Sequence, residues 1–168
     1  MAKFSTNTNR IDPYKNFKFR LKWDGNYIPA VTRVSGLLRT TAAVDPKVGD
    51  TPAPNRAPTG RTKYEPITLQ RGITHDTSFE DWANLAMKQG AQTASTAATP
   101  GVKKDVTIEL YNEAGQLVLA YIVHGCWPSE YGALPDLGDD ANAIAIEHIK
   151  LENEGWERDT SVAPPNQP

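Results

Sequence analysis

The sequence contains three histidines and one cysteine, and one pair of them is close enough to suggest chemistry. His124 and Cys126 are two residues apart, so in a strand both side chains would lie on the same face. A Cys–His nucleophile needs the imidazole within hydrogen-bonding distance of the sulfur, with a third group to orient it. Same-face neighbours on a strand are about 6–7 Å apart along the backbone. We therefore favour a buried cysteine that behaves as a small hydrophobic residue.

Metal and cofactor chemistry is not indicated either. Zinc sites have closely spaced ligands, such as two histidines one helical turn apart, and the acidic segment 136–140 lacks the alternating oxygen ligands of an EF-hand loop. The candidate ligands are widely separated in the sequence: His75, Asp76, His148, Asp139 and Asp140. No phosphate-binding glycine loop or dinucleotide fingerprint occurs. The sequence thus predicts no enzyme, no cofactor and no metal site.

The chain has 168 residues, of which 39% are hydrophobic and 23% charged, and its net charge is −2. This is the composition of a globular domain, and it gives no electrostatic reason to expect nucleic-acid binding. The polar segment 1–10 is unlike a signal peptide, and no apolar run approaches the ~20 residues that span a bilayer. We expect a single domain over 1–168, made in the cytoplasm, with flexible termini at 1–10 and 160–168.

The N-terminal half predicts strands around a long irregular segment. Phe17–Trp23 alternates strictly between apolar and basic residues, the pattern of a half-buried strand. The turn after it, with Gly25, predicts an antiparallel partner over Tyr27–Ser35, with an edge position or bulge at Pro29. Leu38–Thr59 is Pro-rich and has the length of a functional or disordered loop. It is either a mobile surface loop or an arm that orders against a neighbouring subunit.

A third strand over Lys63–Arg71 leads to the one convincing helix, Thr77–Lys88. Asp76 and Thr77 are good N-cap residues, and the spacing of Thr77 and Glu80 is that of a capping box. One face of this helix is apolar and indicates a core anchor: Phe79, Trp82, Ala83 and Ala86. Its other face is polar: Glu80, Asp81, Asn84 and Lys88.

The C-terminal half predicts further strands. Asp105–Tyr111 alternates, and Gln116–Gly125 is apolar on both faces at Leu117–Val123, which indicates a central strand. A break is expected over Cys126–Tyr131, and Ala143–Glu152 is the last expected strand. Together these segments predict a mainly β (α+β) fold, an antiparallel β-barrel or sandwich with one flanking α-helix.

Several motifs in this order resemble contractile-tail tube proteins. They are Asp12-Pro13-Tyr14, the stretch 60–72 (GRTKYEPITLQRG), 109–115 (ELYNEAG), 127–131 (WPSEY) and 149–156 (IKLENEGW). The resemblance covers about Ile11 to Asp159 and is greatest to inner-tube subunits of phage-like extracellular contractile injection systems. It implies the tail-tube fold shared with type VI secretion tubes. It also implies hexameric rings that stack into a hollow tube inside a contractile sheath, which drives the tube and its cargo through a target envelope.

By this resemblance we expect the segment 38–62 to be an extended inter-subunit loop that contacts the adjacent ring. Its polar contributors would be Arg39, Asp45, Asp50, Arg56 and Arg61. The helix would lie outside the wall of the tube, with Glu80, Asp81 and Asn84 facing solvent or sheath. The expected partners are further copies of the chain, the sheath, baseplate and tube-initiator proteins, and cargo in the lumen, with no membrane anchor. Lys18, Arg20 and Lys22 are lumen candidates, although a solvated strand face has the same pattern.

Two alternatives stay open at this point. A tube-initiating or baseplate protein would have the same fold, and would be marked by an additional domain or extension. A monomeric β-sandwich that binds a small ligand or sugar would use exposed aromatic residues such as Tyr27, Tyr131 and Trp156.

Overall fold

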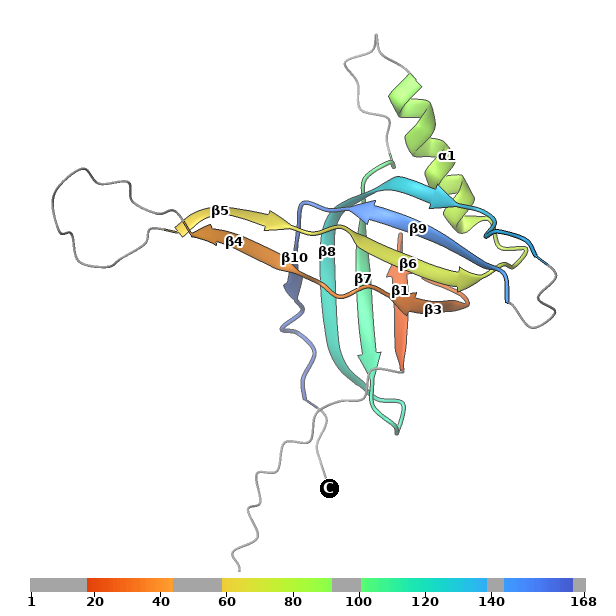
Figure 1. Cartoon of the computed structure of the whole chain (residues 1–168). Coiled ribbons are helices and arrows are strands. Elements are labelled where there is room, and N and C mark those ends of the chain that lie inside the picture. Colours follow the sequence, from red (N-terminus) through yellow and green to blue (C-terminus); the bar gives the residue numbers. More distant parts are fainter. Residues whose placement is uncertain (1–17, 44–58, 92–100, 139–143, 165–168) are drawn as a thin grey trace, which may run out of the picture.

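The computed structural model describes residues 18–43, 59–91, 101–138 and 144–164 (Figure 1). In these segments the elements are β1 (Phe19–Trp23), β2 (Asn26–Ile28), β3 (Val31–Val34), β4 (Arg39–Ala43), β5 (Thr59–Tyr64), β6 (Ile67–Gly72), α1 (Ser78–Ala91), β7 (Lys104–Tyr111), β8 (Leu117–Gly132), β9 (Ile146–Glu152) and β10 (Gly155–Arg158). All strand pairs are antiparallel. A mainly β fold with one flanking helix is therefore confirmed. No helix in the described segments is long and apolar enough to cross a bilayer.

The main sheet runs in the order β2-β1-β7-β8-β9-β6-β3, with β10 also paired to β8. β8 is the strand that joins its two halves, because its first part pairs with β7 and β10 and its last part with β9. The prediction of a break at Cys126–Tyr131 was wrong, since β8 continues to Gly132. The strand bends instead, at Gly125 with a φ of 58°, and its register with β9 shifts just after Pro128. A register shift accommodates a proline, which cannot donate to the ladder.

The sheet does not close into a barrel. Its two end strands, β2 and β3, are consecutive in the sequence and are not hydrogen-bonded to each other. The predicted single strand Tyr27–Ser35 was therefore wrong, because Pro29 and Ala30 separate it into two. Ala30 has a φ of 62°, in the left-handed region, so the chain turns there and crosses from one half of the sheet to the other.

The predicted strand Lys63–Arg71 is also divided, by Glu65 and Pro66, into β5 and β6. β5 leaves the main sheet and pairs with β4, so the start of the predicted loop Leu38–Thr59 forms one strand of a two-stranded ribbon. Figure 1 shows this β4–β5 ribbon projecting from one side of the body. Residues 44–58, between its strands, lie outside the described residues. β10, which follows Glu152, was not predicted.

The core lies between the two halves of the sheet and under α1. Trp23 of β1 packs against two side chains of α1, with ring centroids 5.9 Å from Phe79 and 4.9 Å from Trp82. The indole N–H of Trp82 donates to the Val102 carbonyl oxygen over 2.7 Å, so its polar atom is satisfied inside the core. The expectation that Trp82 is a core anchor is thus confirmed. The remaining buried members of the cluster are Leu21, Ile67, Leu69, Val106, Ile108, Val123, Cys126, Ile149 and Leu151.

The helix starts where its N-cap residues predict. Thr77 is the N-cap, because its carbonyl oxygen accepts the first helical hydrogen bond from the Asp81 N–H over 2.8 Å. The Asp76 carboxylate accepts from the Ser78 N–H over 3.0 Å, which satisfies another N–H at the helix start. The helix continues past its expected end at Lys88 to Ala91.

Candidate assembly surfaces

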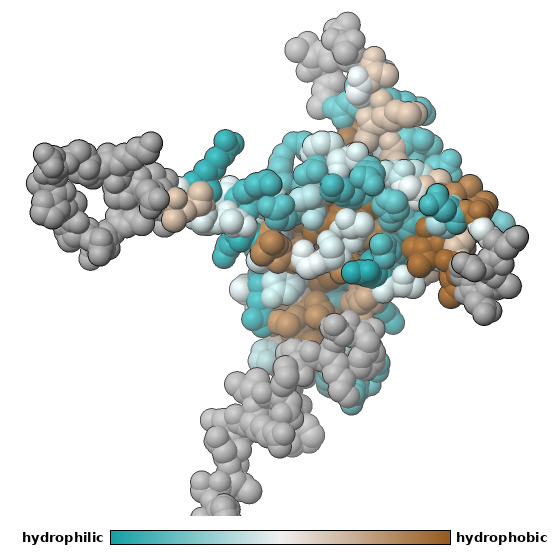
Figure 2. All heavy atoms as spheres, in the orientation of Figure 1, coloured by the Kyte–Doolittle hydropathy of each residue, from teal (hydrophilic) through white to brown (hydrophobic). Residues whose placement is uncertain are grey.

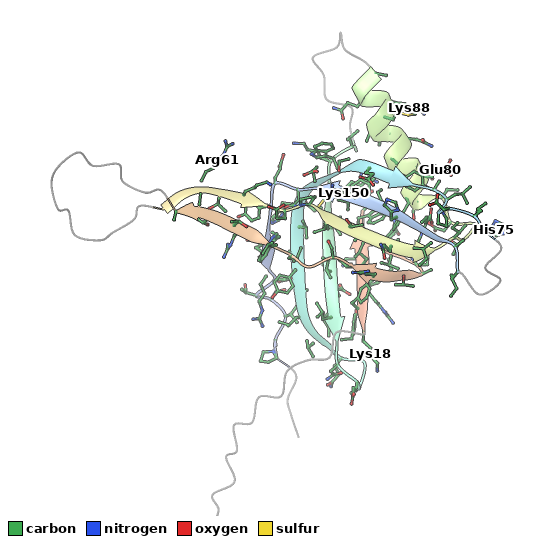
Figure 3. All side chains as sticks on the ribbon, in the orientation of Figure 1. Lys18, Arg61, His75, Glu80, Lys88 and Lys150 are labelled. Atoms are coloured by element: carbon green, nitrogen blue, oxygen red, sulfur yellow. The ribbon has the colours of Figure 1, made fainter. Side chains whose placement is uncertain are left out.

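The β4–β5 ribbon is the most exposed regular structure in the described residues. All five residues of β4 are exposed, and β5 carries exposed Arg61 and Lys63. Figure 3 shows the Arg61 side chain standing clear of the ribbon. Of the five residues expected to contact an adjacent ring, Arg39 and Arg61 lie on this ribbon, whereas Asp45, Asp50 and Arg56 lie outside the described residues. The two strands carry three basic side chains and no acidic one.

The base of the ribbon is fixed to the body by a small set of contacts. The Glu65 N–H donates to the Leu38 carbonyl oxygen over 3.0 Å, and the Asn153 side-chain amide donates to the Glu65 carbonyl oxygen over 3.0 Å. The Trp156 ring packs edge-on against Tyr64 at 6.4 Å and lies 5.4 Å from the Arg39 guanidinium. These contacts hold the root of the ribbon and leave its strands in solvent.

The first turn of α1 presents an acidic surface. Glu80 and Asp81 are exposed and Asn84 is half-buried. The Thr77 hydroxyl donates to the Asp81 carboxylate over 2.8 Å, while Glu80 has no ion pair among the described residues. Acidic side chains at a helix start are favoured by the helix dipole. This stabilises α1, and it leaves a negative surface on the side of the helix away from the core.

A buried ion-pair network ties the start of α1 to the sheet. Arg71, on β6, is fully buried; its Nε donates to Glu147 over 2.5 Å and one of its terminal nitrogens donates to Asp76 over 2.7 Å. The hydroxyl of Tyr131 donates to the second oxygen of Glu147 over 3.0 Å. The guanidinium also lies 4.2 Å from the centre of the Phe79 ring. Three strands and the helix therefore meet at one cation.

These contacts shift the pKa values of the groups in the network. Burial opposes the charge on Arg71, but hydrogen bonds from it to Asp76 and Glu147 raise its pKa overall. The pKa of Asp76 is lowered to about 2, mainly by hydrogen bonds from Ser78 and Arg71. Burial and the bond to Glu147 raise the pKa of Tyr131 to about 12. Sequence reasoning missed this network, although Arg71 continues the inward positions of Ile67 and Leu69, and this alternation is the signal that could have found it.

A second polar cluster lies on the outer face of β1, β2 and β7. The buried Glu109 carboxylate accepts from the hydroxyls of Tyr111 over 2.6 Å and Tyr27 over 3.1 Å, and lies 3.7 Å from the Lys22 ammonium. The guanidinium of Arg20 lies 5.1 Å from the Tyr111 ring. Burial and the bond to Glu109 raise the pKa of Tyr111. Arg20 and Lys22, two of the lumen candidates, therefore already have partners within the subunit.

A groove of about 930 Å³ separates α1 from the last part of β8. Its apolar lining includes Ala83 and Met87 on the helix side and Trp127, Pro128 and Tyr131 on the strand side. It contains none of the three histidines, nor Cys126. It offers an apolar surface for packing, and its polar lining residues are Asn84, Gln89, Lys103, Ser129 and Glu130.

His124 and Cys126 do not form a catalytic pair. Cys126 is fully buried, its thiol donates to the Val123 carbonyl oxygen over 3.4 Å, and burial raises its pKa to about 12. His124 instead lies 3.0 Å from Glu157 and 3.5 Å from Asp105, contacts that raise its pKa. The positive φ at Gly125 between them breaks the strand alternation that would have placed both on one face. Among the described residues, no group of three or more possible ligands could hold a metal.

The aromatic residues considered for a ligand-binding module are mostly engaged. Tyr131 binds Glu147, and Trp156 packs between Tyr64 and Tyr121 with ring centroids at 6.4 and 6.0 Å. Tyr27 is half exposed, but its hydroxyl is committed to Glu109. This arrangement does not favour the binding-module alternative.

Comparisons with solved structures relate this fold to tube proteins. The chain is similar to a chain of the anti-feeding prophage (AFP) tube-terminating cap structure, with a TM-score of 0.74, 22% identity, and coverage of 95% of this chain and 99% of that one. It is similar to a chain of the PVC extracellular contractile injection system sheath–tube complex in the extended state, with a TM-score of 0.65, 24% identity, and coverage of 88% and 91%. Hcp1 from Flavobacterium johnsoniae shares the fold at a TM-score of 0.52 and 10% identity, with coverage of 83% and 93%. These likenesses confirm the tail-tube fold.

The comparison with curated proteins gave no match. A family model does match, however, and it covers residues 15–157, which include both halves of the sheet, the ribbon and the helix. The motifs at 60–72, 109–115, 127–131 and 149–156 all fall inside this range. The expected family is thereby confirmed: the chain belongs to the T4-like virus tail tube protein gp19 family.

Proposed function

We propose that this chain is the repeating subunit of the inner tube of a contractile injection system or phage tail. Hexameric rings of the subunit stack into a hollow tube, a contractile sheath surrounds the tube, and sheath contraction drives the tube and its cargo through a target envelope. The single observation that carries this proposal is the tail tube family match over residues 15–157.

The β4–β5 ribbon is the element that we assign to contact with the adjacent ring. Its exposure on both faces and its basic charge support this assignment. Arg39 and Arg61 would contribute from the strands, and Asp45, Asp50 and Arg56 from the segment between them. Replacing residues 45–58 by a short Gly-Ser linker should leave a folded subunit that no longer stacks, because such linkers are flexible and carry no contacts of their own. Normal tube formation by this variant would contradict the assignment.

The acidic start of α1 is the surface that we assign to the sheath. Glu80 and Asp81 are exposed and Asn84 lies one turn further along, so these side chains can meet a basic partner. Glu80→Lys with Asp81→Lys should weaken sheath loading more than tube assembly, because exposed charges act mainly through complementary potentials. Lys88→Glu, on the last turn of the same helix, is the matched control for a change of charge. Unchanged sheath loading by the double variant would remove this docking surface.

The subunit would be made in the cytoplasm and assembled, with baseplate and tube-initiator proteins, into a phage-tail-like particle. A first test is negative-stain electron microscopy of the purified, concentrated chain together with its mass from light scattering. Six-fold rings or stacked tubes are the expected result. A monomer at high concentration that also fails to join tubes in the presence of its sheath and baseplate would overturn the proposal.

A further inference from the structure

Exposed large apolar side chains gather at the end of the molecule opposite the ribbon. We call this the end patch; it consists of Ile73, Leu134, Leu137, Ile144 and Ile146, which are exposed by 42%, 66%, 77%, 79% and 40%. The other large apolar side chains that are exposed among the described residues are Tyr27, Leu38, Met87 and Trp127. Figure 2 shows the hydrophobic atoms collected beside the segment that joins β8 to β9.

The patch is a single surface built from three segments of the chain. Ile73 directly follows β6, and its N–H donates to the Ala145 carbonyl oxygen over 3.1 Å, beside Ile146 at the start of β9. Leu134 and Leu137 follow the end of β8, where Gly132 pairs with His148 of β9. A contiguous apolar surface of this kind on a protein marks an interaction site.

The ribbon and the end patch lie at opposite ends of the continuous segment formed by β5 and β6. β5 ends at Tyr64 and β6 begins at Ile67, so the ribbon leads into β6, and β6 ends at Gly72 immediately before the patch. Figure 1 shows the two features on opposite sides of the body. A contact between such different surfaces of identical subunits is heterologous, so it propagates from copy to copy instead of closing as a dimer.

The charges on the two surfaces are complementary. The described strands of the ribbon contain only basic charges, and Arg61 is exposed without an ion pair among the described residues. Asp136 lies in the sequence between Leu134 and Leu137 of the end patch, is exposed, and also has no ion pair among the described residues. The ribbon has no core of its own, and a two-stranded ribbon is marginally stable in water alone. The ribbon is therefore basic, and packing against a second surface would stabilise it.

We propose that the end patch receives the β4–β5 ribbon of a second copy of this chain in the next ring, with Arg61 of one copy against Asp136 of the other. This inference rests on the proposed function, because it names the surface that completes the stacking contact. Apolar side chains of the patch would be covered by the ribbon, and the Arg61–Asp136 pair would fix the register between the rings.

The test compares the full-length chain with three sets of variants, by sedimentation of stacked tubes and by negative-stain counts of rings and tubes. Leu134→Ser with Ile144→Ser should reduce stacked tubes at least tenfold while six-fold rings persist. Met87→Ser is the matched control, because Met87 is 66% exposed, as is Leu134, but lies on the groove side of α1. It should change stacking by less than twofold. Melting curves of all variants should coincide with that of the wild type, since the side chains are exposed.

A charge exchange tests the pairing independently of the apolar surface. Arg61→Asp alone and Asp136→Arg alone should each reduce stacking about tenfold, and the double variant should recover most of it. Any of four results would overturn the inference. They are full stacking by Leu134→Ser with Ile144→Ser, an equal loss of stacking with Met87→Ser, a loss of rings rather than of stacked tubes, and no recovery when Arg61→Asp is combined with Asp136→Arg. If the wild type forms tubes, those results contradict this inference and leave the proposed function unaffected. A wild type that forms neither rings nor tubes would contradict both the inference and the proposed function.

Discussion

The surroundings of Arg71 and the base of the β4–β5 ribbon both contain ion pairs between a basic and an acidic side chain, but the first is buried and the second is exposed. Arg71 has 0% exposure and donates four hydrogen bonds, to Glu147, Asp76 and Ser78, so it connects β6, β9 and the start of α1. At the base of the ribbon, Lys63 of β5 also forms an ion pair, at 3.3 Å with Glu65 just after the strand, but the two side chains are 72% and 35% exposed. The body is thus stabilised within the subunit, whereas the ribbon adds little to the subunit and keeps its side chains available to other chains.

The largest expected effect is that of removing the buried cation. Arg71→Met would leave the carboxylates of Glu147 and Asp76 without their partner, Glu147 being almost completely buried. Breaking one side of a buried pair costs about 3–5 kcal/mol. We expect this loss in the free energy of unfolding measured by urea denaturation of the subunit under conditions where it does not assemble. A loss below about 1 kcal/mol would mean that the network is not the energetic centre of the body.

The pH dependence of stability tests the second carboxylate of the network. The pKa of Asp76 is about 2 in the folded chain, below its ordinary value of 3.8. A lowered folded-state pKa stabilises the protein above the unfolded-state pKa, and this contribution is lost as the pH falls from about 4 to about 2. Because the side chain is 36% exposed, we discount the full linkage value and expect about 1–2 kcal/mol.

The measurement is the unfolding free energy at several pH values between 5 and 2, for the wild type and Asp76→Asn. The asparagine cannot ionise, so its unfolding free energy should fall less steeply with decreasing pH across this window. At pH 7 the variant should be the less stable of the two. Parallel pH profiles for the two chains would show that Asp76 does not carry this dependence.

Tyr131→Phe should have a smaller effect. The phenol donates to Glu147 over 3.0 Å, and Phe preserves the ring while removing the hydroxyl. Glu147 keeps its contact with Arg71, so the cost is that of one hydrogen bond to a charged group, about 1–2 kcal/mol. Tyr27→Phe, in the second polar cluster, is a useful comparison. The Tyr27 hydroxyl bonds to Glu109 over a similar distance, 3.1 Å, but the Tyr27 side chain is more exposed. An equal or larger loss at Tyr27 would reverse this ranking.

The parts of the fold that were predictable are those where local pattern and tertiary environment agree. The helix start at Thr77, the alternation of β7 and the burial of Trp82 follow from capping and periodicity. The division of Tyr27–Ser35 into two strands was not predictable from its apolar pattern, because it depends on the turn at Ala30 and on the strand with which each part pairs. The continuation of β8 beyond Gly125 depends in the same way on long-range pairing with β9. Long-range pairing also determines what faces Arg71, which the sequence alone shows only as a basic residue at an inward position.

The proposed assembly surfaces were partly predictable for the same reason. The Pro-rich segment Leu38–Thr59 was predicted to be either a mobile surface loop or an arm that orders against a neighbouring subunit, and the structure adds that β4, at its start, pairs with β5. The end patch was not foreseen, because Ile73, Leu134 and Ile144 are far apart in the sequence and each would be unremarkable as a single exposed residue. Only the pairing of β6 with β9, and of β9 with β8, brings them together.

The smallest expected effect on stability is on the ribbon, and it is the strictest test of the comparison. Lys63→Met removes an exposed ion pair of the same chemical type as the Arg71 pairs. Exposed pairs contribute about 0–1 kcal/mol, because water solvates both charges and the side chains lose entropy on pairing. We therefore expect the unfolding free energy of the subunit to change by less than about 0.5 kcal/mol. Should Lys63→Met destabilise the isolated subunit by more than about 2 kcal/mol, the ribbon would be an integral part of its folding unit, and its exposure could not be assigned to contacts between chains.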